Sequence, residues 1–183
     1  QHRRKHQQLK QTKASLMERM FPAPSETVPQ VRFDGFDGEW REKPLRQLGV
    51  AKTGFGFPHA AQGGRVGVPF FKVSDMNLSA NTSTMQVANN YVTSDQVVRY
   101  GWQPIVDVPA ILFAKVGAAV FLGRKRTVQA PFLMDNNMMA FCIDEQRWDA
   151  TFARAVFDSL DLSQLVQVGA LPSFNPPQLH DMV

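Results

Sequence analysis

Short apolar runs of strand length constrain this chain most, because runs of this kind are typical of strands buried in a sheet. Ile111–Ala114 is such a run, and it resumes as Ala118–Leu122 after the break at Gly117. Val68–Val73 and Met138–Ile143 are two further runs of similar length. We expect 111–114 and 118–122 to be buried strands of one sheet, with the other two runs as additional strands.

A charged and amide-bearing stretch accompanies these runs. Lys115 stands between two of them, and burying it would be costly without a partner, so we expect it to point toward solvent or an anion. The basic run Arg124–Arg126 follows, and Asp135–Asn137 adds three short polar side chains. Such groups at the edge of an apolar support are typical of a binding surface. A solvated hairpin followed by an asparagine turn would contain the same residues, so that alternative stays open.

A helix is predicted after the last of these strands. Four apolar residues recur every four positions, namely Trp148, Phe152, Val156 and Leu160. This spacing predicts an amphipathic helix over 146–160 that packs on the sheet. Asp144 and Glu145 would then lie at its N-terminus, where carboxylates interact favourably with the helix dipole. The expected fold class is α+β, with a twisted mixed or antiparallel sheet and one packed helix.

The first 20 residues predict a protruding and largely polar helix. Its apolar stripe is narrow and consists of Leu9, Thr12, Leu16 and Met20. A narrow stripe is typical of a coiled-coil seam, so we expect a partner helix in this chain or another. Prolines end the helix near residue 21. The chain therefore divides into a helix over 1–21, a linker over 22–39 and a globular part over 40–183.

Charge is distributed unevenly along the 183 residues, whose formal net charge is +4. Residues 43–130 hold ten Lys and Arg against three Asp and Glu. Residues 22–42 hold two against five, and residues 131–183 hold two against seven. A basic block between acidic flanks favours a polyanionic partner, nucleic acid first. A solvated basic surface remains the simpler interpretation of the same block.

No catalytic or metal-binding constellation is evident. The chain lacks zinc-ligand spacing and a G-x-S-x-G motif, and His2 and His6 have no third ligand nearby. The Gly-rich stretch 54–67 has neither a P-loop lysine nor a G-x-G-x-x-G motif at a helix start. Asn175–Gln178 resembles an adenine-methyltransferase signature but lacks its aromatic residue.

The remaining titratable groups favour structural roles. His59 and His180 are isolated, and we expect both to be loop histidines. Cys142 lies in an apolar run, where a buried inert thiol is expected. A single cysteine permits no internal disulfide and fits a reducing cytoplasm. No apolar run approaches the length needed to cross a membrane.

Several segments, in order along nearly the whole chain, resemble one known family. They are Leu9–Pro22, Val28–Phe36 with Trp40, Phe70–Asn77, Ala88–Val92, Lys115–Ala119, Asp135–Met139 and Gly169–Ser173. Together they are similar to the specificity (S) subunits of type I restriction-modification systems. The first segment resembles the end of the long conserved spacer helix. The second resembles the entry to the second target recognition domain.

The resemblance implies a non-catalytic role in DNA recognition. Such subunits hold two target recognition domains joined by two long antiparallel helices, and each domain reads half of a bipartite site in double-stranded DNA. Methyltransferase (M) subunits dock on the helices, and a restriction/translocase (R) subunit joins them. S-adenosylmethionine belongs to the methyltransferase, so no cofactor is expected in this chain. The chain would be the second recognition domain with the end of the spacer helix, truncated before the C-terminal conserved helix.

Candidate DNA contacts follow from residue type and position. The phosphate contacts we expect are Lys52, Lys72, Lys115, Arg124, Lys125 and Arg126. The base-reading residues we expect are Ser74, Asp75, Asn77, Asn136 and Asn137, because Asn pairs with adenine and Asp accepts from cytosine. Each could instead cap a turn or be solvated. Two alternatives stay open for the chain: a protein-interaction scaffold with a basic face, and the recognition domain of a single-chain restriction-methylation enzyme.

Overall fold

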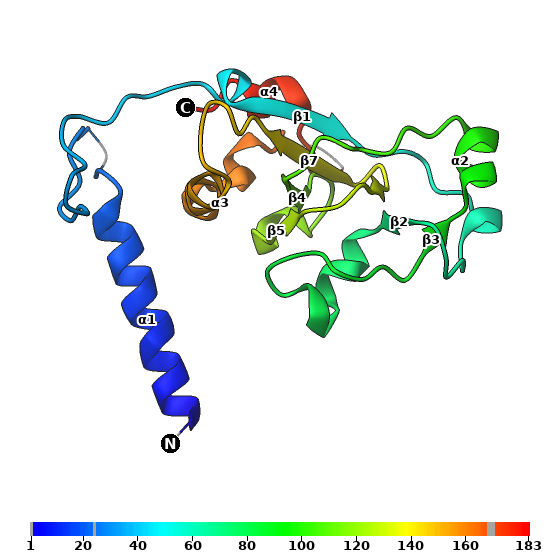
Figure 1. The fold of residues 1–183 in the computed structure, drawn as a ribbon, viewed down its shortest axis with the longest axis horizontal. Coiled ribbons are helices and arrows are strands. Elements are labelled where there is room, and N and C mark those ends of the chain that lie inside the picture. The colour runs from blue at the N-terminus through cyan, green and yellow to red at the C-terminus, as the bar shows by residue number, and fades with distance from the viewer. Residues whose placement is uncertain (1, 24, 168–170) are drawn as a thin grey trace. The chain divides into compact units, whose positions relative to one another are not determined.

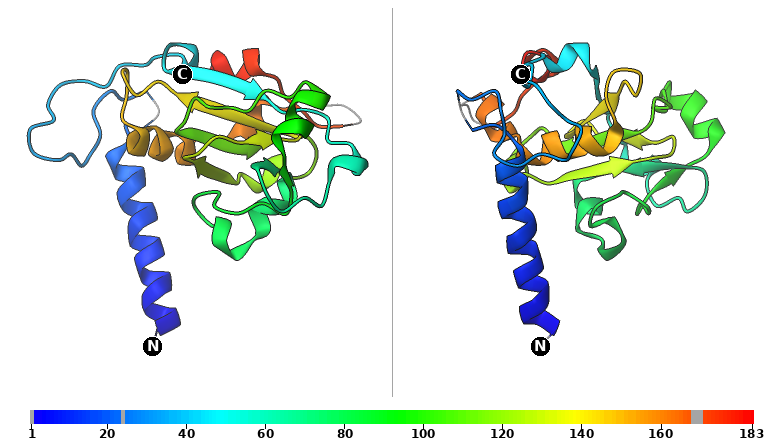
Figure 2. Two further views of the ribbon diagram at one scale, coloured as in Figure 1. Left: turned by 45° about the vertical axis from the view of Figure 1, so that its right-hand side comes forward. Right: turned by 60° about the vertical axis from the view of Figure 1, so that its left-hand side comes forward.

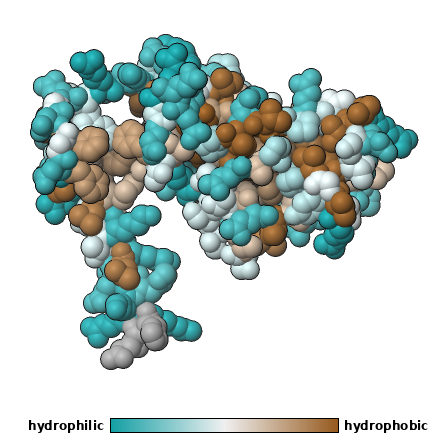
Figure 3. All heavy atoms as spheres, in the orientation of Figure 1, coloured by the Kyte–Doolittle hydropathy of each residue, from teal (hydrophilic) through white to brown (hydrophobic). Residues whose placement is uncertain are grey.

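The computed structural model describes residues 2–23, 25–167 and 171–183, which form two compact units, 1–43 and 44–183 (Figure 1). In the first unit α1 (His2–Met20) confirms the predicted helix. Leu9 and Leu16 of its stripe are exposed, and the helix surface is mainly hydrophilic (Figure 3). A partner helix for this stripe therefore stays a prediction.

The predicted linker folds back on the end of α1. The N–H of Val31 donates to the carbonyl of Arg19 over 3.1 Å. The rings of Phe21 and Trp40 meet edge to face, with their centroids 5.3 Å apart. These contacts give the segment after the helix a defined local path.

The second unit holds the sheets. Its strands are β1 (Gly49–Thr53), β2 (Val68–Phe71), β3 (Tyr91–Val92), β4 (Ala110–Ala114), β5 (Lys125–Val128), β6 (Leu133–Met134) and β7 (Met138–Ile143). Its α-helices are α2 (Ser94–Tyr100), α3 (Ala150–Ser159) and α4 (Pro176–His180). Its 3-10 turns are η1 (Leu45–Gln47), η2 (His59–Ala61), η3 (Val73–Asn77), η4 (Ser79–Asn81), η5 (Val120–Leu122) and η6 (Leu162–Leu165).

The unit contains one antiparallel sheet and one mixed sheet, which confirms the expected α+β class. The main sheet has four strands in the order β1-β7-β4-β5, and every neighbouring pair is antiparallel. The smaller sheet has the order β3-β2-β6, with β2 and β6 parallel. Figure 2 shows α3 lying along one side of the main sheet.

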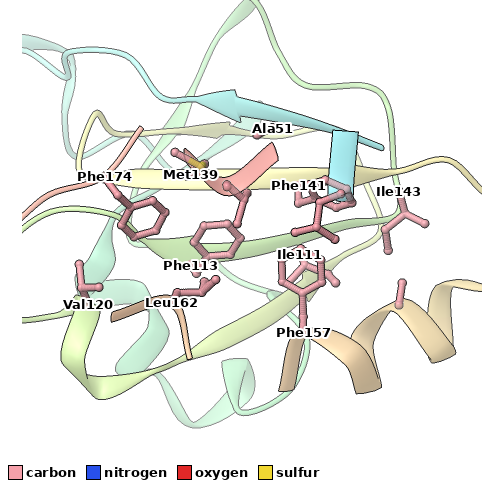
Figure 4. Close-up of a cluster of buried hydrophobic side chains, with 13 residues drawn as sticks. Ala51, Ile111, Phe113, Val120, Met139, Phe141, Ile143, Phe157, Leu162 and Phe174 are labelled. Atoms are coloured by element: carbon pink, nitrogen blue, oxygen red, sulfur yellow. The ribbon is translucent and has the colours of Figure 1, made fainter. Parts of the chain in front are cut away.

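The central strands β4 and β7 are buried along their whole length, which explains their continuous apolar sequence. Alternate residues face opposite sides of a strand. Ile111 and Phe113 therefore face α3 and pack with Phe157 and Phe174 (Figure 4). Leu112 faces the other side and packs in a second cluster, which includes residues of the smaller sheet.

The predicted strand over 118–122 is wrong. This segment forms the turn η5, in which Val120 is buried but Phe121 and Leu122 are exposed. Gly117 and Gly123 adopt positive φ values of 72° and 58°, a conformation that glycine adopts readily and that ends a strand. The strand that pairs with β4 is instead β5, which begins inside the basic run.

The predicted helix over 146–160 is shorter than expected. α3 begins at Ala150, because the side chain of Asp149 accepts a hydrogen bond from the N–H of Phe152 and caps the helix. The placement of Asp144 at the helix start is therefore wrong. Its carboxylate accepts from the N–H of Gln146 and pairs with Arg147 in the preceding turn.

The C-terminal segment also differs from expectation. His180 is part of α4 and not of a loop, and its Nε2 accepts a hydrogen bond of 2.9 Å from the N–H of Ala51 in β1. Asn175 caps α4 by accepting from the N–H of Gln178. The string that resembles a methyltransferase signature is thus a helix start. Residues 169 and 170 of the segment 169–173, which carries part of the family resemblance, lie outside the described residues.

Candidate nucleic-acid interface

One end of the main sheet gathers most of the candidate residues. The register pairs Ala114 with Met138, so Lys115 at the end of β4 lies beside Asn137 before β7. The N–H of Lys115 donates to the carbonyl of Asn137 over 2.9 Å. Arg124 stands at the same end, directly before β5. We name this end the polar rim and assign to it Lys72, Ser74, Asn77, Lys115, Arg124, Arg126, Asn136 and Asn137.

The smaller sheet brings Lys72 to the same rim. Because β2 and β6 are parallel and pair Phe71 with Met134, Lys72 and Asp135 leave their strands side by side. The N–H of Asp135 donates to the carbonyl of Phe71 over 2.9 Å. The ammonium of Lys72 donates to Gln62 Oε1 over 3.2 Å.

Asp135 is a buried carboxyl beneath the rim. Burial raises its pKa above the ordinary value, and the nearby carboxylate of Asp75 adds to this effect. Hydrogen bonds from Asn137 and the charge of Lys72 act in the opposite direction. The carboxyl holds the turn into β7 by accepting from the N–H of Asn137 over 3.1 Å.

The basic run Arg124–Arg126 is divided between two sides of the sheet. Lys125 pairs with Phe113 and shares its side, where its ammonium donates to the carbonyl of Leu160 over 2.7 Å. Lys125 is buried, and desolvation lowers its pKa. Lys125 therefore makes a structural contact and lies outside the polar rim, unlike the phosphate contact that was expected. The reason is that side chains alternate between the two sides of β5.

The two arginines of the run point the other way. Arg124 donates to the side-chain oxygen of Asn77, and Arg126 Nε donates to the carbonyl of Asn81 over 2.5 Å. Burial lowers the pKa of Arg126, as do the neighbouring charges of Arg154 and Arg124. A guanidinium has five N–H donors, so both arginines keep donors for an anion.

Asp75 also differs from the base-reading role expected from the sequence, because its side chain is completely buried. Its carboxylate accepts from the N–H of Lys72 over 2.8 Å and from the N–H of Asn89 over 3.2 Å. These bonds hold η3 and leave no room for a base edge. Ser74 and Asn77 of the same turn are exposed.

Lys52 does not join the polar rim. It forms an ion pair with Asp107, and this hydrogen bond raises its pKa. Both line a shallow pocket beside β1. Arg46, in the wall of the same pocket, pairs with Asp181. Lys52 and Arg46 are thus both paired with carboxylates. In contrast, four cations of the polar rim form no ion pair with a carboxylate within the described residues, namely Lys72, Lys115, Arg124 and Arg126.

Two residues that organise the rim gave no signal in the sequence. Asn81 is buried and holds the loop after η4, with Nδ2 donating to the carbonyl of Asp75 and Oδ1 accepting from the N–H of Gln86. Arg154 of α3 donates to the carbonyl of Ser83 over 3.0 Å. Arg154 acts on a loop 71 residues away in sequence, so local spacing could not reveal it. Asn81 acts on residues five and six positions away, and its residue type alone did not indicate these contacts.

The described ranges hold no group of three or more His, Cys, Asp or Glu side chains placed to bind a metal ion. Among the helices described, none has the length and apolar character of a membrane span.

Comparisons with known proteins are informative only at the level of the fold. No family model and no curated protein matches the sequence. The S subunit of a type I restriction-modification system from M. genitalium aligns with a TM-score of 0.55 and 13% identity, over 83% of this chain and 35% of that chain. The HsdS subunit from Thermoanaerobacter tengcongensis aligns with a TM-score of 0.51 and 12% identity, over 96% and 43%.

A third solved chain comes from a structure that describes the assembly and conformational transition of the type I R-M system. It aligns with a TM-score of 0.65 and 13% identity, over 98% of this chain and 41% of that chain. This chain therefore spans less than half the length of each of the three solved chains. The fold expected from the sequence resemblance is confirmed: the chain has the fold of part of a type I restriction-modification S subunit.

Proposed function

We propose that this chain is a DNA target recognition domain that reads one half of a bipartite site for a type I restriction-modification system. The observation that carries the proposal is the polar rim, where cations without carboxylate partners lie beside exposed amides. The fold shared with S subunits supports it. The role is non-catalytic and belongs in the cytoplasm.

The rim offers the two kinds of group that DNA recognition requires. The rim cations Lys72, Lys115, Arg124 and Arg126 contact phosphates and set the orientation of the duplex. Asn136 is exposed, and its amide makes no hydrogen bond within the described residues, so it is available for an adenine edge. Ser74 and Asn77 extend the reading surface along η3.

Partner subunits supply the chemistry in this proposal. The methyltransferase subunit binds S-adenosylmethionine and methylates adenine, and the restriction/translocase subunit cleaves. The exposed stripe of α1, through Leu9 and Leu16, provides a seam for a second spacer helix.

Selection of duplexes from a randomised library by the full chain tests the proposal. We expect enrichment of one short, defined sequence over random DNA. Asn136→Ala should then weaken binding to the selected duplex by roughly 1–3 kcal/mol and change binding to random DNA little. Ser79→Ala, at an exposed position in η4 outside the polar rim, is the control. A library that shows no enrichment would contradict the proposal, and equal losses on both duplexes would make Asn136 structural.

A further inference from the structure

The turn η5 carries two apolar side chains that the proposed function does not use. Phe121 and Leu122 are each 59% exposed, whereas Val120 beside them is only 4% exposed. Val120 packs in the cluster that contains Phe113 and Phe174 (Figure 4). The turn is therefore anchored in the core while its two larger apolar side chains face solvent.

The backbone of this turn is fixed from both sides. The N–H of Gly123 donates to the carbonyl of Val120 over 3.0 Å, and the residue adopts a φ of 58°. The N–H of Gly117 donates to the carbonyl of Pro172 over 2.7 Å. Phe121 and Leu122 are therefore exposed to solvent on a turn whose backbone is held by hydrogen bonds.

The charges around the turn indicate the kind of partner. Lys115 precedes it and Arg124 follows it, and both belong to the polar rim. The acidic groups near the adjoining strand, Asp158 and Asp161, act on Lys125, whose ammonium lies on the α3 side. Apolar side chains flanked in the sequence by two cations suit duplex DNA, in which stacked bases lie between rows of phosphates.

We propose that Phe121 and Leu122 form a wedge that enters the duplex between two adjacent base pairs while Lys115 and Arg124 hold phosphates on either side. Phe and Leu are among the side chains that unstack a base step and kink the duplex in this way. A wedge adds specificity without hydrogen bonds, because pyrimidine–purine steps unstack more easily than others. This inference rests on the proposed function.

Fluorescence of 2-aminopurine tests the wedge, because this base analogue brightens when it is unstacked. The selected duplex carries the analogue at each position in turn and is titrated with the full chain. We expect a rise in fluorescence at one base step. The double variant Phe121→Ser, Leu122→Ser should lose this rise and at least about tenfold in affinity, since the unstacked step loses its apolar contacts. Both side chains are mostly exposed, so the melting temperature should change little.

Val98→Ser provides the matched control, because Val98 is 81% exposed on α2 and is not part of the polar rim. This variant should keep the affinity and the fluorescence rise of the parent chain. A parent chain that binds the selected duplex with no rise at any position overturns the wedge and leaves the recognition role intact. A double variant that keeps both affinity and rise overturns it as well. Failure of the parent chain to bind any duplex overturns the recognition role itself.

Discussion

Neutralising the basic run one residue at a time tests whether the polar rim meets DNA. Arg124 and Arg126 face the loop that contains Asn77 and Asn81, whereas Lys125 donates to the carbonyl of Leu160 on the other side of the sheet. Three consecutive cations should therefore behave in two different ways. Arg124→Gln and Arg126→Gln remove phosphate contacts, and Lys125→Met removes none.

The magnitude follows from counterion release. Each phosphate contact contributes about 0.9 to the slope of log affinity against log salt concentration. The two arginine substitutions together should lower this slope by about 1.8, so between about 50 and about 200 mM salt the variant should lose roughly 12-fold less affinity than the parent chain. Lys125→Met should keep the parent slope.

Fluorescence anisotropy with a labelled duplex at several salt concentrations measures the slope. Thermal unfolding of each variant is the control, because Lys125→Met also removes the hydrogen bond to Leu160, at a cost of at most about 3 kcal/mol in stability. A slope that falls for Lys125→Met as much as for Arg124→Gln would refute the division of the run. An unchanged slope for the double arginine variant would remove the rim from the interface.

Two further predictions concern stability. Burial raises the pKa of Asp135, so its folded form binds a proton more tightly than the unfolded chain, and its contribution to stability falls as pH rises from the ordinary value of 3.8 through the folded pKa. Asp135→Asn should therefore gain stability relative to the parent as pH rises over that window in urea titrations, and a pH-independent difference would refute this. Phe157 is fully buried between α3 and the main sheet, so Phe157→Ala should cost about 3–5 kcal/mol in the free energy of unfolding. Phe152→Ala, on the same helix but 42% exposed, should cost clearly less, and equal losses would contradict this account of the core.

The buried strands were predictable because their sequences are apolar on both faces. The runs Ile111–Ala114 and Met138–Ile143 became β4 and β7 with nearly the expected bounds. The run 118–122 has a similar composition, yet the glycines at both of its ends turn the backbone, and only Val120 reaches the core. Composition predicts that a run can be buried, but backbone conformation decides whether it is a strand.

The positions of the candidate residues in the fold were predictable in outline and less so in detail. Lys115 and Asn136 lie at a strand end, as expected from their positions next to apolar runs. Asp75 and Lys125 are buried because distant segments pack over them: Asn89 reaches Asp75, and the end of α3 reaches Lys125. Such contacts depend on the folded arrangement and cannot be predicted from the local sequence.

The order of the strands also determines when the domain can fold during synthesis. β7 lies between β1 and β4 in the main sheet, although it is the last of the strands to be made. During synthesis, roughly 90 further residues are added after β1 before its partner strand β7 is complete, and pairing over such sequence distances is slow. A chain interrupted between β6 and β7 would leave β1 without a partner strand and separate it from β4. Nascent forms of this protein should therefore depend on chaperones until residue 143 has emerged, and truncation before β7 should yield aggregates instead of a smaller folded domain.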